Sequence, residues 1–124
     1  MTQGLSDVPA ISVPSGGSVF VKTAFATIAT TSLTNVVAAV AGKRLKIWEF
    51  CVQAETLSSI YFASNSTPIS QTVKLAAYGS WIGEPIEIYE QNSPALLTNV
   101  GEALSLKQNT TGPTNVWVKY TEED

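Results

Sequence analysis

The run from Ala41 to Ala54 constrains the fold more than any other part of the chain. After a turn-like Ala-Gly pair, Leu45 and Ile47 are separated by a single polar residue. Because successive side chains of a β-strand point to opposite faces of a sheet, this alternation predicts a half-buried strand. Phe50 and Val52 are out of phase with that pattern, so the strand is either buried on both sides or contains a β-bulge between Ile47 and Phe50. Long, bent strands of this kind suit a β-sandwich.

The rest of the chain consists of short runs with strand-like composition, separated by turn signals that contain Gly, Pro, Asn and Ser. The best helix candidate, residues 34–41, is apolar almost throughout and rich in Val, so a strand is favoured there too. About eight strands with turns every 8–12 residues or so predict an all-β protein, a single β-sandwich or jelly roll of antiparallel strands. Besides the long strand, the predicted runs are 19–28, 33–40, 57–63, 71–76, 85–90, 103–107 and 115–120.

The length of 124 residues predicts one domain. Residues 18–121 form the expected β-sandwich, and residues 122–124 form an acidic tail that we expect to be solvated. Residues 1–17 contain several Pro and Gly and show no periodic pattern, which predicts an extended N-terminal arm.

The arm carries apolar side chains that a free tail would not need. This favours an arm that becomes ordered against a neighbouring molecule. The candidate interface residues in it are Leu5, Val8, Ile11 and Val13.

Charge and hydropathy exclude two classes of partner. The net charge is −3, and the only basic cluster is Lys43, Arg44 and Lys46, so we expect no nucleic-acid surface. The longest apolar stretch, residues 36–42, is too short to span a bilayer, and the N-terminus lacks the pattern of a signal peptide. We therefore expect no membrane partner and synthesis in a cytoplasm.

The sequence offers few candidate catalytic residues. The chain has no His, which removes His bases, Ser-His or Cys-His nucleophiles and His metal ligands. Glu84, Glu87 and Glu90 would alternate between the faces of a strand and would not converge, although a carboxylate pair assembled by the fold stays open. Cys51 is the one cysteine, which excludes an internal disulfide and favours a buried thiol. We expect a protein that is not an enzyme and that has no cofactor or metal.

Three segments together resemble a known family. They are 41–47 (Ala-Gly-Lys-Arg-Leu-Lys-Ile), 101–106 (Gly-Glu-Ala-Leu-Ser-Leu) and 116–120 (Val-Trp-Val-Lys-Tyr). In this order, across residues 30–121, they resemble the small β-sandwich (jelly-roll-like) capsid decoration or cement proteins and head-accessory proteins of tailed bacteriophages. Thr114-Asn115 departs from the small turn residue that precedes the last strand in that family.

The resemblance implies a structural virion protein that acts by binding. It would be a cement or decoration subunit on the capsid exterior, bound to the major capsid protein and itself a homo-oligomer, either a dimer or a trimer. The alternative is a receptor- or carbohydrate-binding domain of a head or tail fibre, with Tyr78 and Trp81 at a loop tip. Trp48 and Trp117, on the strand faces opposite the predicted core, either close the second side of the sandwich or belong to an interface.

Overall fold

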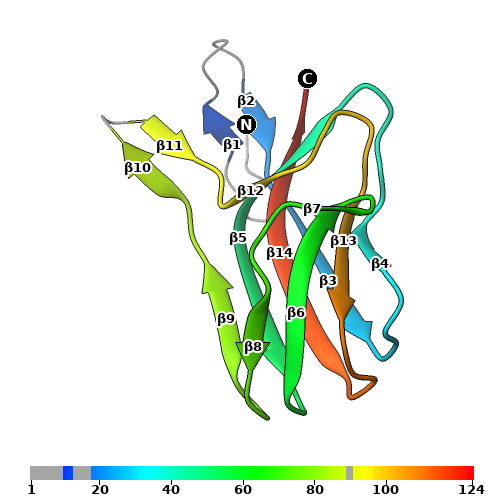
Figure 1. The fold of residues 1–124 in the computed structure, drawn as a ribbon. Coiled ribbons are helices and arrows are strands. Elements are labelled where there is room, and N and C mark those ends of the chain that lie inside the picture. Colours follow the sequence, from blue (N-terminus) through cyan, green and yellow to red (C-terminus); the bar gives the residue numbers. More distant parts are fainter. Residues whose placement is uncertain (1–9, 13–17, 89–90) are drawn as a thin grey trace.

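The computed structural model of the chain describes residues 10–12, 18–88 and 91–124. These residues form strands and turns and contain no helix, which confirms the all-β prediction. The strands build two layers that pack face to face as a β-sandwich (Figure 1).

Each layer is an antiparallel sheet of five strands. The β5 sheet has the order β12-β5-β14-β3, with β9 also paired to β5, and the β6 sheet has the order β4-β13-β6-β7, with β8 also paired to β6. The bounds in the β5 sheet are β3 (Lys22–Ile28), β5 (Arg44–Ala54), β9 (Ser80–Gly83), β12 (Leu96–Leu97) and β14 (Thr114–Glu123). Those in the β6 sheet are β4 (Thr34–Val37), β6 (Ser58–Ser64), β7 (Thr67–Pro68), β8 (Val73–Leu75) and β13 (Leu104–Gln108).

Consecutive long strands alternate between the two sheets. β3 is in the β5 sheet, β4 in the β6 sheet, β5 again in the first and β6 in the second, and β13 and β14 divide in the same way. Their alternating apolar side chains therefore meet in one core between the layers. Its members include Ile28, Leu45, Ile47, Phe50, Val52, Ile60, Phe62, Leu104, Leu106, Val116 and Val118.

The phase slip in β5 is a bulge. Lys119 of β14 pairs with Glu49, but the next residue, Tyr120, pairs with Ile47, so Trp48 is the extra residue on β5. Both Ile47 and Phe50 consequently face the core although they are three positions apart. Of the two readings left open by the sequence, the bulge is correct.

The C-terminal residues differ from the solvated tail expected for 122–124. Glu122 and Glu123 are the last residues of β14, paired in register with Leu45 and Arg44. Glu123 is only 9% exposed, because its carboxylate has hydrogen-bond and ion-pair partners within the sheet. Asp124 alone is exposed, with a side chain that is 84% accessible.

Two short hairpins project from one end of the sandwich, the end at which the C-terminus lies (Figure 1). One pairs β1 (Ala10–Ser12) with β2 (Ser18–Phe20), and the other pairs β10 (Ile86–Ile88) with β11 (Gln91–Ser93). β2 also contacts β14. The first hairpin falls within and just after the predicted arm, of which residues 1–9 and 13–17 lie outside the described residues.

Candidate binding surface

The candidate site is the outer face of the β5 sheet, the face turned away from the core. Four strands lie side by side across it in the order β9-β5-β14-β3. In β3, the core-facing positions are Ala24, Ala26 and Ile28, whereas Phe25 between them is 74% exposed. This inverts the usual placement, since the largest apolar side chain of the strand faces outward.

An apolar row crosses these four strands. Phe25 of β3 pairs with Trp117 of β14, Trp117 pairs with Cys51 of β5, and Cys51 pairs with Ile82 of β9. Directly paired residues of antiparallel strands lie on the same face at about 4.5–5.5 Å between their Cβ atoms, so the four side chains form one continuous line. Ile82 is 63% exposed, and a shallow hollow of about 350 Å³ lies along the row beside Phe25, Trp117 and Cys51.

One flank of the apolar row is neutral and polar. Thr27, Asn115, Gln53 and Ser80 occupy the neighbouring paired positions on β3, β14, β5 and β9. The Thr27 hydroxyl donates to Asn115 Oδ1 at 3.0 Å, and Asn115 Nδ2 donates to Glu55 Oε2 at 3.1 Å.

The other flank carries opposite charges. Lys119 of β14 and Glu49 of β5 are paired residues, and their Nζ and Oε1 atoms are 3.9 Å apart. The Lys119 ammonium also lies 5.4 Å from the centre of the Trp117 ring, within the range of a cation–π contact. The outer face therefore presents an apolar line between a neutral polar row and an ion pair.

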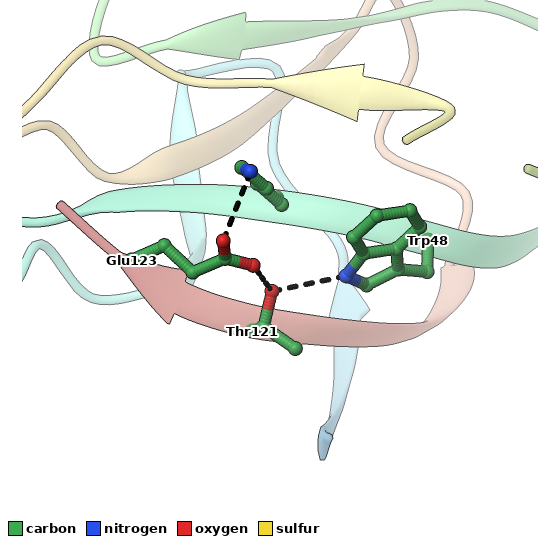
Figure 2. Close-up of polar contacts among 4 residues, drawn as sticks. Trp48, Thr121 and Glu123 are labelled. Carbon is green, nitrogen blue, oxygen red and sulfur yellow. Dashed lines mark hydrogen bonds and ion pairs between the residues drawn. The ribbon is translucent and has the colours of Figure 1, made fainter. Parts of the chain in front are cut away.

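A polar cluster fixes the geometry of the same sheet at the bulge. The indole N–H of Trp48 donates to Thr121 Oγ1 at 2.9 Å, and the Thr121 hydroxyl donates to Glu123 Oε2 at 2.6 Å (Figure 2). The second carboxylate oxygen of Glu123 lies 2.9 Å from the Lys46 ammonium. The indole of the bulged residue is thus connected to the last residues of β14 through hydrogen bonds to Thr121 and Glu123, which is a structural role.

Tyr78 and Trp81, both predicted at a loop tip, have different environments in the structure. Tyr78 is in a turn, with φ of +62° and 73% exposure. Trp81 is in β9 and not in a loop, and its ring meets Phe50 edge-on with centroids 5.0 Å apart and Phe62 at 5.4 Å. The expected loop placement of Trp81 was wrong, because β9 pairs with β5 and directs the indole toward the core.

Trp81 retains one open side. With Phe50, Val73 and Leu96 it borders a hollow of about 450 Å³ at the edge between the two sheets. Gln71 and Glu84 also line this hollow. The ring is half-buried, so it offers less surface for stacking than an indole at a loop tip would.

The arm candidates are only partly placed. Ile11 is in β1, opposite Val19 of β2. Leu5, Val8 and Val13 lie outside the described residues. Their role in binding stays a prediction.

Sequence reasoning missed Phe25 and Ile82, and its prediction of a buried Cys51 thiol was wrong, because Cys51 lies between the core residues Phe50 and Val52 and so faces the outer side of the sheet. The alternation of small and large residues in 22–28 does carry a signal for Phe25, because Ala24, Ala26 and Ile28 form the more consistent core-facing set. Ile82 has no such signal, since only the pairing of β9 with β5 shows which way it points. Trp117 was correctly placed on the strand face opposite the core.

The described part of the chain shows neither a cluster of metal-ligating side chains nor a membrane-spanning helix. Among those residues, no group of three or more His, Cys, Asp or Glu is arranged to hold a metal ion. Nor does the described structure contain a helix long and apolar enough to cross a membrane.

Comparison with known proteins gives a fold-level likeness. No family model matches the sequence, and no curated protein matches it. Among solved structures, the chain is similar to a chain of the Cyanophage Pam1 capsid asymmetric unit, with a TM-score of 0.53 and 13% sequence identity. The likeness covers 96% of this chain and 96% of that chain, so it extends over nearly the full length of both.

Proposed function

We propose that this chain is a structural virion protein, a capsid cement or decoration subunit that binds the major capsid protein on the exterior of the head and stabilises it. The observation that carries the proposal is the fold likeness to a chain of a cyanophage capsid unit over 96% of both chains. A fold alone does not specify a function, so the surface has to supply the binding capacity.

The strand arrangement supports a jelly roll. The orders β3-β14-β5-β9 and β4-β13-β6-β8, with consecutive strands exchanged between the sheets, are those of two interleaved Greek keys. The jelly roll is a common architecture of viral capsid proteins, which agrees with the proposed role.

The surface supports binding. Phe25, Ile82 and Tyr78 are large side chains with more than 60% of their surface exposed, and only 14% of the chain is charged. Aromatic side chains contribute much of the energy at interfaces. In the proposed particle the arm, residues 1–17, runs along the major capsid protein or a neighbouring subunit, and the chain is a homo-oligomer.

Copy number tests the function. Particles purified from the source that encodes this chain are analysed by quantitative mass spectrometry against the major capsid protein. Hundreds of copies per particle are expected for a decoration subunit, whereas a handful of copies would indicate a vertex or tail part. Absence from the particles would contradict the virion role.

Binding by the arm is tested on heads that lack the protein. The full-length chain and a variant with Leu5, Val8, Ile11 and Val13 all replaced by Ser are added back, and cosedimentation and heat resistance of the heads are measured. We expect the native chain to bind and stabilise the heads and the variant to lose both effects. Equal binding by the variant would contradict a role of the arm in the interface. A loss of host adsorption with normal head stability would favour the alternative of a receptor-binding fibre domain.

A further inference from the structure

We propose that the outer face of the β5 sheet is the self-association face of this protein, and that its occupant is the same face of a second copy related by a two-fold axis. The inference rests on the proposed homo-oligomer and gives it a surface, a symmetry and specific residue pairs. It is argued from the rows of paired residues that cross β9, β5, β14 and β3.

The order of the strands permits this symmetry. A two-fold axis that runs parallel to the strands, in the plane between two facing sheets and midway between β5 and β14, exchanges β5 with β14 and β9 with β3. Each residue of β5 or β14 then faces the copy of its paired residue on the other of these two strands, and each residue of β3 or β9 faces the copy of the residue at the opposite end of its row. In an isologous dimer the same patch must be complementary to itself, and this axis satisfies that condition at every row.

The charged row gives the strongest complementarity. Lys119 of one copy faces Glu49 of the other, and Glu49 faces Lys119. Together with the intrachain pair, whose charged atoms are 3.9 Å apart, the four groups form a square of alternating charges. Complementary charges of this kind fix register and suppress alternative pairings.

The other two rows match as well. Trp117 faces Cys51 of the second copy, so a large side chain lies opposite a small one, and Phe25 faces Ile82. In the polar row Asn115 faces Gln53, whose side chains both donate and accept hydrogen bonds. Packed sheets lie about 10 Å apart. The apolar rows of the two copies fill that space, because each copy contributes one aromatic side chain from β3 and one from β14.

A perpendicular axis fits less well. A two-fold axis along the apolar row would place Trp117 against Trp117 and Cys51 against Cys51. It would also bring the Lys119–Glu49 row against the neutral Asn115–Gln53 row, leaving the charges without partners across the interface. The charge pattern therefore selects the axis parallel to the strands.

The size of the face predicts a weak dimer. Four strands at about 4.8 Å spacing and five residues at about 3.4 Å rise cover a plan area of roughly 300 Å². This is less than the roughly 800 Å² of accessible surface that each partner buries in a standard interface, so we expect dimers only at high concentration. On a particle surface, anchored subunits reach such effective concentrations.

The decisive experiment uses two single charge reversals of the full chain, Glu49→Lys and Lys119→Glu. Sedimentation velocity is measured over a concentration series at low ionic strength for the native chain, for each variant alone and for their equimolar mixture. Each variant alone carries two like charges on its face, so its dissociation constant is expected to rise about tenfold or more. In the mixture, every introduced charge faces an opposite charge of the other variant, and we expect heterodimers at the native concentration range.

The mixture separates the interface from the fold. Within each variant the intrachain ion pair stays broken, so restored association in the mixture can come only from contacts between copies. Because Lys119 and Glu49 are both exposed, with side chains 40% and 42% accessible, each variant is expected to unfold near the native midpoint. A third variant, Phe25→Ser with Ile82→Ser, removes only exposed apolar surface and is expected to abolish dimers while the chain stays folded.

A native chain that is monomeric at all concentrations would overturn the inference, as would native dimers that none of these variants weakens. A mixture that stays as weak as its two components would overturn it as well. These outcomes are separable from the proposed virion function. If the chain is monomeric but present in hundreds of copies on particles, only the proposed dimer interface is contradicted. If it dimerises through this face but is absent from particles, only the proposed virion function is contradicted.

Discussion

The indole of Trp48 donates a hydrogen bond to the hydroxyl of Thr121 at 2.9 Å, across the point where β5 and β14 slip by one residue. This bond gives the bulged side chain a fixed partner on the neighbouring strand. The bulge in turn allows one strand, Arg44–Ala54, to present core residues on both sides of the slip. The contact therefore links a local irregularity to the continuity of the core.

Replacing Trp48 with Phe tests that link. The ring can still pack, but the hydrogen bond to Thr121 is lost, so we expect the free energy of unfolding to fall by about 1 kcal/mol. Chemical denaturation should show a lower midpoint with an unchanged slope. Trp117→Phe is the control, because no acceptor for the Trp117 indole is found among the described residues, and equal effects of the two substitutions would contradict a specific role for the bond.

The Glu123–Lys46 pair should contribute more to stability than the adjacent exposed pair. In Glu123→Gln the Thr121 contact can be kept, but a largely buried ammonium loses its counter-charge 2.9 Å away, and we expect a loss of about 1–3 kcal/mol. Asp124→Asn is the matched control: its carboxylate pairs with Lys43 at 2.7 Å but is 84% accessible, so we expect less than about 0.5 kcal/mol. Thermal and denaturant unfolding of both variants measure the difference, and similar losses would mean that burial of Glu123 is unimportant.

Gln108 should be among the most sensitive polar positions. Its buried amide nitrogen donates to the backbone oxygens of Ile28 at 3.1 Å and Thr30 at 3.2 Å, and its amide oxygen accepts from the Thr114 hydroxyl. Gln108→Leu keeps a similar volume but leaves those groups without a partner, so we expect a loss of about 2–4 kcal/mol.

The matched control for that variant is Gln71→Leu at an exposed position, for which we expect a change within about 0.5 kcal/mol. Denaturant unfolding compares the two. If Gln108→Leu unfolds at the native midpoint, the hydrogen bonds of the Gln108 amide do not contribute to stability.

We expect Tyr120 to make the stability of the protein sensitive to alkaline pH. Burial raises the pKa of its phenol above the ordinary value of 10.0, the charge of Glu122 raises it further, and Lys22 opposes the shift. Folding thus favours the neutral phenol, so its stabilising contribution is complete below pH 10.0 and is lost as the pH rises through the higher pKa of the folded protein.

We therefore expect the free energy of unfolding to fall more steeply above that pH for the native chain than for Tyr120→Phe. Unfolding curves over an alkaline pH series measure this difference, and comparison with the variant removes the contribution of the other groups of the chain. Parallel pH profiles for the two proteins would show that the phenol does not couple to folding.

Short-range pattern was sufficient for much of the fold. Strand positions such as 57–63 and 115–120 were predicted within a few residues, because alternating side chains report which face a strand buries. The phase slip between Ile47 and Phe50 even located the bulge. Trp81 was misplaced because its neighbours Tyr78-Gly79-Ser80 signal a turn, and nothing local shows that a strand begins at Ser80.

By itself, the sequence determined an all-β sandwich with Ala41–Ala54 as its long bent strand, since periodicity and turn residues act over a few positions. Only the tertiary structure decided which side chains share a surface. Phe25, Trp117, Cys51 and Ile82 lie far apart in the chain and meet because β3, β14, β5 and β9 pair in one register. Likewise, Glu122 and Glu123 look solvated in sequence but end a paired strand, because hydrogen bonding to β5 extends β14 to Glu123 and supplies Lys46 as a counter-charge.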